Sequence, residues 1–412
     1  MSPRRLDLRI LCTSGAAIKS TLDSWPTLPL VISYDSRWQS KHMPRNVIDA
    51  LRHPDRLCQI HLDVTSSMTV SIVEAMQDLK PCQALESIRI TIKNATGPSI
   101  LARNAFFGGS SPHLREIKLD GIAFPFPAIQ QVLLSTTNLV EFHLSKIPND
   151  FYFSPEDLVI GLSTSVQLER LLIGFYSPAS RPPSSMIRPP SQRTSLPSLA
   201  FLDFYVTSEY LEEFVARIDL PALSTIQIKL FNDIVFEIPQ FCEFIPRLNT
   251  PGSPTSARVI LYSQFVQVSF FHEANPGIEW YSFETPCIPL DWQLSFVTQI
   301  SSQLSPLLAS VHELTIAAGS ILKVPTRERG VDSTEWLELF QPFTHVTKVS
   351  VWENQLVPGI LEALMEDVAA GVLPELNNLH LSEYRSTPSV AVAAKHFVAT
   401  RRLSGRTVHL IG

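Results

Sequence analysis

Histidines, some of them beside carboxylates, are the side chains whose types could do chemistry in this chain. A histidine can act as a general base or bind a metal, and both tasks need further polar groups at a fixed spacing. His61, His143 and His380 recur at one position of a repeated phrase, and His312 directly precedes Glu313. The sequence has no HExxH metal motif, no GxSxG nucleophile turn and no glycine-rich phosphate loop. We therefore predict no catalytic, metal-binding or cofactor-binding site and expect that the protein is not an enzyme.

The repeated sequence motif that contains these histidines, which we call the phrase, has apolar residues at its first, fourth and sixth positions. Leu57-Cys58-Gln59-Ile60-His61-Leu62 is one copy, and over 57–223 the first leucine recurs about every 28 residues. This spacing is typical of the strand in a leucine-rich repeat, in which alternation points the fifth position away from the core, so we interpret the histidines as surface side chains. Copies begin at Leu57, Leu85, Leu114, Leu139, Leu168, Leu199, Leu223, Val311, Val346 and Leu376.

Helical patterns lie between the phrases, so each repeat is expected to be a strand followed by a helix. Ser154-Pro155-Glu156-Asp157, for example, combines an N-cap, a first-turn proline and acids that suit the positive end of a helix. The fold class is therefore α/β, a leucine-rich-repeat-like solenoid: an open arc with a parallel β-sheet on its inner face and helices outside. We expect 1–56 to form an N-terminal cap or linker and 57–412 the solenoid. Further helices are predicted at 66–79, 125–137, 208–218, 333–340, 358–370 and 388–401.

Two segments interrupt this pattern. The loop 177–198 is rich in proline, serine and arginine and has almost nothing to bury, which predicts a mobile loop in place of one helix. It can be a tolerated surface insertion, a phosphorylation site or a proline-rich ligand. The segment 249–296 contains runs of period two at 258–262, 266–270 and 278–283. These runs predict strands, either of degenerate repeats or of a small meander, in the least regular of the ordered parts. The sequence does not give their order.

The strand pattern also predicts a surface, because the third, fifth and seventh positions of each phrase project from the sheet. One reading is a docking face for an acidic partner, built on a basic row of fifth positions beside exposed aromatic anchors. The other reading is that Glu116 and Glu141 pair with Arg89, Lys118 and Arg170 and only keep the sheet solvated. The candidate partner-binding residues are His61, Arg89, Lys118, His143, Phe201, Tyr205 and Trp352.

Composition limits the compartment and the partners. The net charge of −6 is small for 412 residues, and the sequence has no basic stripe of the kind that binds nucleic acid. Five cysteines without a CxxC pair are typical of a reduced intracellular protein with buried thiols. The first residues lack the apolar core of a signal peptide, and no apolar run approaches the ~18 residues of a membrane span. We expect a cytoplasmic or nuclear protein with no nucleic-acid and no membrane partner.

The amino-acid sequence of the first part of the chain is similar to that of a known family. The segments Arg4–Cys12, Trp25–Ile32, Val47–Leu51 and Asp55–Leu62 resemble the region that follows the F-box in fungal F-box proteins with degenerate leucine-rich repeats. In that family the F-box binds a Skp-type adaptor of a cullin-RING ubiquitin ligase, and the repeats present the substrate. The resemblance begins where the F-box would end. We therefore expect no F-box in this chain, and adaptor binding only if one lies upstream.

Two functions follow from these observations. The first is a non-catalytic protein-protein interaction module, the substrate-recognition repeat domain of an F-box-type ubiquitin ligase component. The alternative is a free-standing leucine-rich-repeat scaffold unrelated to ubiquitin ligation. In both cases the partner is a protein.

Overall fold

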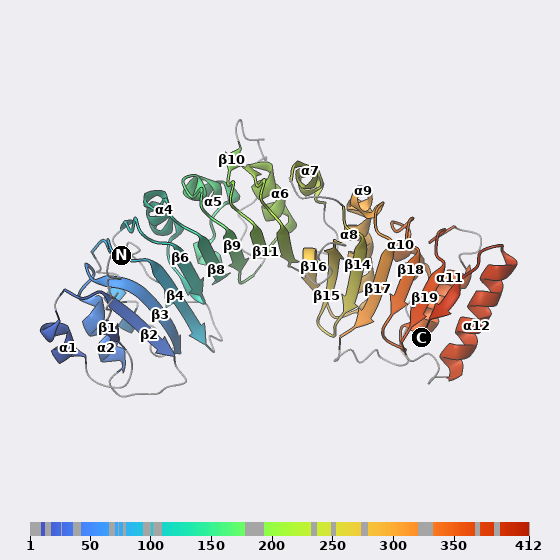
Figure 1. Ribbon diagram of the computed structural model, residues 1–412, viewed down its shortest axis with the longest axis horizontal. Coiled ribbons are helices and arrows are strands. Elements are labelled where there is room, and N and C mark those ends of the chain that lie inside the picture. Colours follow the sequence, from blue (N-terminus) through green and yellow to red (C-terminus); the bar gives the residue numbers. More distant parts are fainter. Residues whose placement is uncertain are drawn as a thin grey trace, which may run out of the picture. The chain divides into compact units, whose positions relative to one another are not determined.

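The protein is a mixed α/β chain whose strands form large, mostly parallel sheet regions that are not closed into a barrel (Figure 1). It divides into two compact units, Met1–Val206 with Glu213–Leu223 (unit 1) and Thr207–Glu212 with Ser224–Gly412 (unit 2). None of the described helices is long and apolar enough to cross a membrane. The computed structural model describes residues 10–12, 18–25, 27–35, 43–65, 71–72, 74–76, 80–93, 100–101, 109–177, 193–231, 237–248, 253–272, 279–319, 333–366, 371–382 and 388–411.

The main sheet of unit 1 is parallel throughout, and its strands follow one another in space in their order along the chain. These strands are β1 (Ile10–Cys12), β2 (Leu30–Asp35), β3 (Leu57–Thr65), β4 (Ser87–Lys93), β6 (Glu116–Asp120), β8 (Glu141–Ile147), β9 (Arg170–Phe175) and β11 (Phe201–Val206). The region expected to be a cap or linker thus contributes β1 and β2. Two short parallel pairs lie beside the sheet, β5 (Ile100–Leu101) with β7 (Ile122–Ala123) and β10 (Thr194–Ser195) with β12 (Ile218–Asp219).

The predicted strand phrases are confirmed with their register. In β6, Ile117 and Leu119 at the fourth and sixth positions are completely buried, as is Leu114 at the first position. Before the phrase, the Leu114 amide donates to the carbonyl of Ser111 (3.1 Å), which turns the chain into the strand. The same turn precedes β9, where Leu168 donates to Ser165 at 3.1 Å. A strand that buries alternate residues on one face leaves the others on the opposite face.

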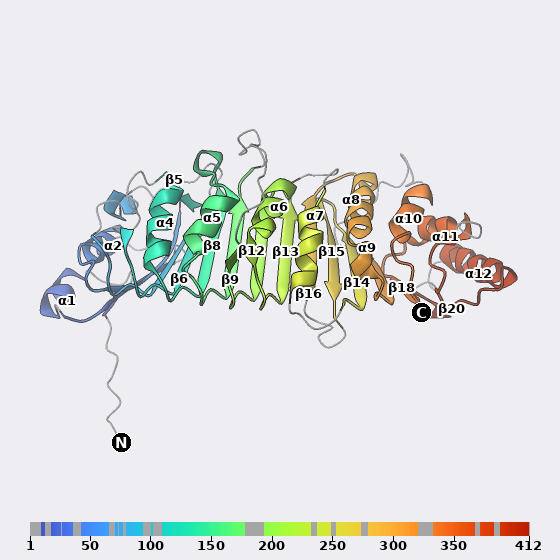
Figure 2. The same ribbon diagram turned by 90° about the horizontal axis from the view of Figure 1, so that it is seen from above.

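Helices cover one face of the sheet of unit 1 (Figure 2). The structure confirms the helix predicted from Ser154, whose hydroxyl accepts from the Asp157 amide while the Asp157 carboxylate accepts from the Ser154 amide. Of the helix predicted at 66–79, only 71–72 and 74–76 are described, and both stretches are helical. The helices are α1 (Lys19–Ser24), α2 (Met43–Leu51), α4 (Phe126–Ser135), α5 (Pro155–Leu162) and α6 (Ser208–Ala216), which the division of units crosses.

The sheet of unit 2 contains a small meander, one of the two arrangements that the sequence left open for the segment 249–296. Its strand β15 runs antiparallel to both of its neighbours, so β14, β15 and β16 form a meander, and the other described pairings in this sheet are parallel. In spatial order the strands are β13 (Thr225–Leu230), β16 (Glu279–Pro286), β15 (Phe265–Phe271), β14 (Ser256–Leu261), β17 (Glu313–Ala318), β18 (Lys348–Val351), β19 (Asn378–Leu381) and β20 (His409–Ile411).

The segment 249–296 is therefore more regular than expected. Its three predicted strands are confirmed, and its end belongs to a long helix that the sequence reading missed, α8 (Leu290–Gln303). The signal was present, since Leu294, Val297 and Ile300 recur at helical spacing and are all buried. The other helices of unit 2 are α7 (Pro239–Phe244), α9 (Ser305–Leu308), α10 (Ser333–Phe340), α11 (Val357–Glu366) and α12 (Pro388–Leu403).

The end of the proline-rich loop 177–198 is ordered, contrary to expectation. Thr194 and Ser195 form β10, and Leu196 is completely buried. Leu196 lies three residues before Leu199, as Ser111 lies three residues before Leu114, and its carbonyl accepts the Leu199 amide at 3.3 Å. Leu196 therefore belongs to the turn before the next strand. The rest of the predicted loop, 178–192, lies outside the described residues.

Candidate functional site

The candidate residues of unit 1 lie on the sheet face opposite the helices. Direct register partners on β3, β4, β6 and β8 are His61, Arg89, Lys118 and His143, which we call the fifth-position row. Neighbouring strands are about 4.8 Å apart, so the side chains of such a row touch their neighbours. The parallel row beside it, the third-position row, is Ser87, Glu116, Glu141, Arg170 and Phe201.

The two rows are joined by an ion ladder of Arg89, Glu116, Lys118, Glu141 and Arg170. Glu116 Oε1 lies 2.6 Å from Arg89 Nε and 2.9 Å from Lys118 Nζ. Lys118 Nζ also lies 2.9 Å from Glu141 Oε2, and the other oxygen of that carboxylate, Oε1, lies 3.3 Å from Arg170 Nε. Each carboxylate thus lies between two cations, which is the pairing of the second reading above.

A hydrogen-bonded chain extends the ladder to His61. The Ser87 hydroxyl donates its proton to Glu116 Oε2 at 2.9 Å. The Ser87 oxygen is then left to accept a hydrogen bond from His61 Nε2 at 3.0 Å. This geometry assigns the proton of the neutral imidazole to Nε2. Sequence reasoning gave Ser87 no role, although its place between a histidine and a glutamate on adjacent strands was the available signal.

The electrostatics make the fifth-position row less basic than its composition indicates. Burial and the nearby Arg89 charge lower the pKa of His61, and burial lowers the pKa of His143. An imidazole with a pKa below its ordinary value of about 6.5 is neutral near pH 7. The two remaining cations of the row, Arg89 and Lys118, are both paired with carboxylates. The carboxylates of the third-position row therefore neutralise the two cations, which is the second of the two readings that the sequence left open.

Glu116 lies at the centre of this arrangement. Burial alone would raise its pKa, but hydrogen bonds from Arg89, Lys118 and Ser87 lower it. Its side chain is 13% exposed, whereas that of Arg89 is 51% exposed, so the carboxylate is the fixed part and the guanidinium is the part that reaches solvent. A carboxylate held in this way stays ionised and is a poor proton acceptor for catalysis.

The ladder ends on an apolar surface. Arg170 Cζ lies 4.1 Å from the centre of the Phe201 ring, a cation-π contact. Phe201, Leu172 and Tyr205 are half-exposed on β9 and β11. The sheet face of unit 1 therefore carries fixed, alternating charges at one end and, at the other, apolar side chains around Asp203, the register partner of Leu172.

Trp352 is the one candidate residue that belongs to unit 2. It directly follows β18, is 61% exposed, and its ring centre lies 6.2 Å from that of His380. The structure thus brings six of the seven predicted residues onto one face of unit 1 and places Trp352 in unit 2.

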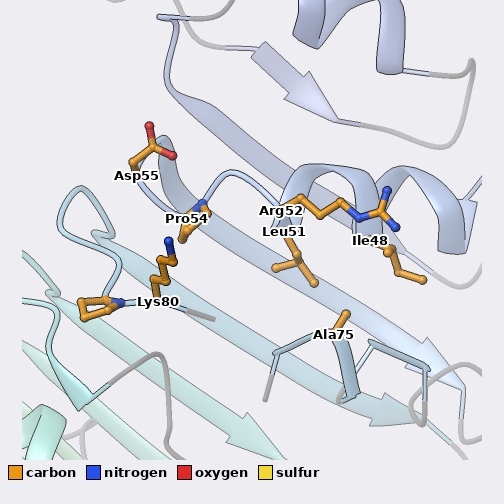
Figure 3. A pocket seen from close by; sticks show the side chains of 8 residues that line it. Ile48, Leu51, Arg52, Pro54, Asp55, Ala75 and Lys80 are labelled. Carbon is orange, nitrogen blue, oxygen red and sulfur yellow. The ribbon is translucent and has the colours of Figure 1, made fainter. Parts of the chain in front are cut away.

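A cavity of about 680 Å³ lies elsewhere in unit 1 (Figure 3). It opens between α2, the turn that follows it and the residues that lead into β4. None of the candidate residues lines it, and Figure 3 shows Leu51, Ile48 and Ala75 at its apolar part. Its described lining residues are Ile48, Leu51, Arg52, Pro54, Asp55, Ala75, Lys80 and Pro81. Among the described residues, no three His, Cys, Asp or Glu side chains are grouped to hold a metal ion.

A comparison of the sequence with protein-family models found no match, and a comparison with curated proteins found no relative.

Proposed function

We propose that the protein is a non-catalytic protein-protein interaction module with the architecture of a leucine-rich-repeat-like solenoid, an open arc with the sheet on its inner face. A repeated backbone contact supports this architecture. The residue after the first leucine of one phrase donates its amide to the equivalent carbonyl of the preceding phrase: Arg115 to Glu86 (2.7 Å), Val140 to Arg115 (2.8 Å) and Glu169 to Val140 (2.8 Å). Successive units that contact only their neighbours in one geometry are the basis of a solenoid.

The sheet face of unit 1 is the proposed binding surface, and the ion ladder with its apolar end is the observation that carries the proposal. Side chains held in register by the backbone lose little further freedom when a partner binds. Because the cations of the ladder are matched by carboxylates, most of the affinity is expected from Phe201, Leu172 and Tyr205. The exposed guanidinium groups of Arg89 and Arg170 contribute mainly orientation and association rate.

Within this proposal, the protein serves as the substrate-recognition part of an F-box-type ubiquitin ligase component. The resemblance of 4–62 to the region after the F-box supports this role. The alternative, a scaffold without a link to ubiquitin, shares the binding surface and differs only in whether a Skp-type adaptor joins the assembly.

The proposal is tested by tagging the full chain, identifying its partners by mass spectrometry and measuring the affinity of the most abundant one with purified proteins. We expect Phe201→Ala with Tyr205→Ala to weaken that affinity at least about tenfold. Arg89→Glu is expected to reduce the association rate and its dependence on salt. Trp25→Ala and Lys19→Glu are matched controls, because Trp25 is 59% exposed and Lys19 lies exposed on α1, outside the sheet face.

Unchanged affinity in the double aromatic variant, with a native circular dichroism spectrum, would place the interface elsewhere. The same purification with an upstream F-box segment joined to the chain distinguishes the two roles: a Skp-type adaptor that co-purifies only with the extended chain supports the ligase role.

A further inference from the structure

Unit 2 exposes an aromatic surface of its own, at the carboxyl ends of β14, β17 and β18, which lie side by side (Figure 1). Val351 is the register partner of Ile316, so Trp352 stands beside Ala317 on the next strand. Val351 and Ile316 are completely buried, and alternation therefore directs Trp352 and Ala317 to the opposite, solvent-facing side. The tryptophan borders a stretch of small residues at the end of β17.

Two further aromatic rings lie on the other side of that stretch. The rings of Tyr262 and Phe265 are stacked, with centres 4.1 Å apart and planes inclined by 21°. Tyr262 lies directly against Gly319, where an added Cβ would be 2.2 Å from Tyr262 Cδ1. The absence of a side chain at Gly319 thus lets the Tyr262 ring rest on the end of β17. We call Tyr262, Phe265 and Trp352 the aromatic platform.

The spacing of the platform suits a particular ligand conformation. Tyr262 is level with Gly319 and two strands away from Trp352, so the backbones of the two aromatic residues are about 12 Å apart. The Tyr262 ring reaches over Gly319, which lies one strand and two residues, about 8 Å, from the backbone of Trp352. A polyproline II helix advances about 9 Å per turn of three residues, so successive turns can rest on Trp352 and on the Tyr262 pair. Aromatic side chains with this arrangement are a known mode of recognising proline-rich segments.

Hydrogen bonding and charge favour the same ligand. Neither the indole N–H of Trp352 nor the hydroxyl of Tyr262 bonds to any of the described residues, so both can donate to a ligand. A polyproline II segment has no internal hydrogen bonds and, at proline, only carbonyl acceptors to offer. Glu353 directly follows Trp352 and makes no ion pair with a described cation, which suits a ligand with a basic residue at that end.

We propose that the aromatic platform binds a proline-rich segment of a partner protein in the polyproline II conformation, with an arginine or lysine next to Glu353. Proline rings pack between Trp352 and the stacked Tyr262–Phe265 pair, and the two free donors bond the carbonyls of the ligand. This surface belongs to unit 2 and does not depend on the binding face proposed for unit 1.

The test uses the full chain and a fluorescein-labelled peptide of one arginine followed by about eight prolines, with fluorescence anisotropy as the readout. We expect saturable binding that weakens at least about tenfold in Trp352→Ala and in Tyr262→Ala. Trp25→Ala, which removes an equally exposed tryptophan from unit 1, should change the affinity less than about twofold. A peptide with alanine in place of each proline should not bind. Absence of saturable binding to the wild type, or equal affinity of Trp352→Ala, overturns the proposal.

Two further measurements test the charge and the source of the ligand. Glu353→Gln should weaken the affinity for the arginine-proline peptide and leave the affinity for a peptide with a neutral end unchanged. Equal losses of affinity for both peptides would contradict the placement of the basic residue next to Glu353. A peptide of residues 178–192 of this chain carries two Arg-Pro-Pro triplets and serves as a second probe. If it binds more than about tenfold tighter than the first peptide, the assignment to a separate partner is wrong and the chain supplies its own ligand.

Discussion

The register of β6 can be tested by placing one residue type at two neighbouring positions. Leu119 is completely buried beneath the sheet, and Lys118 projects from the other face between Glu116 and Glu141. Asparagine at either position has the same poor strand propensity, so that cost is common to Leu119→Asn and Lys118→Asn. The two variants then differ in the side chain that is removed and in the environment that the asparagine enters.

The structure sets the size of the difference. Removing the buried leucine side chain costs about 2–5 kcal/mol, and an amide without hydrogen-bond partners in the core adds about 1–3 kcal/mol. Lys118→Asn loses two ion pairs whose lysine side chain is 30% exposed. Pairs of this kind contribute about 0.2–1 kcal/mol each, so the loss stays below about 2 kcal/mol. We expect Leu119→Asn to unfold unit 1 or to bring it close to unfolding, since total stabilities are about 5–15 kcal/mol.

Urea unfolding followed by circular dichroism measures both variants, and hydrogen exchange of peptides that contain β6 assigns the loss to unit 1. Leu119→Ala, which lacks the polar atoms, should lie between the two. Free energies of unfolding that agree within about 0.5 kcal/mol for Leu119→Asn and Lys118→Asn would refute the assigned register.

Four titratable groups give three further expected outcomes. Burial raises the pKa of Glu212, although its two carboxylate oxygens accept the Gln240 and Phe241 amides, so ionisation of this group costs folded-state stability above the raised pKa. The stability of wild type relative to Glu212→Gln in urea unfolding should therefore rise as the pH falls from the raised pKa to the ordinary carboxyl value. Because the pKa values of His61 and His143 are lowered in the folded protein, the unfolded chain binds protons more strongly at these two residues. The stability of the folded protein therefore decreases as the pH falls below about 6.5. A His61→Gln, His143→Gln double variant should lose less stability on acidification than wild type. Burial raises the pKa of Cys82 to about 12, so iodoacetamide at about pH 8 should modify it, as read by mass spectrometry, only after unfolding.

Much of the fold could be predicted because local pattern and burial agree in the repeated phrase. The fourth and sixth positions are apolar in every copy, and a strand can satisfy that pattern only by putting them on one face. The order of β14, β15 and β16 could not be predicted, since hairpin pairing inside the segment 249–296 competes with pairing to β13 and β17, and tertiary packing decides between them. Leu196 was missed because the proline-rich composition around it concealed a single buried leucine in a turn.

Which residues share the sheet face was predictable, whereas for their charge the sequence left two readings open, and the structure shows the ion pairs of the second. Strand alternation correctly placed Arg89, Lys118 and the two histidines on one face. Whether the row is basic depends on the partners of each cation and on how far the imidazoles are buried, and both are properties of the assembled sheet. The assignment of Trp352 to a different unit from Phe201 and Tyr205 is likewise a property of the folded chain.

The meander in unit 2 has a consequence for the order of folding. Three strands reverse direction twice, so β16 runs parallel to β13 and β14 runs parallel to β17. The register partners Ile226 and Tyr281 are about twice as far apart in sequence as Ser87 and Glu116 in unit 1. Pairings with a larger sequence separation form more slowly, whereas the hairpins of β14, β15 and β16 close over short connections. We expect these hairpins to form early and to act as the template onto which β13 and β17 are later added, which makes the meander the nucleus of unit 2.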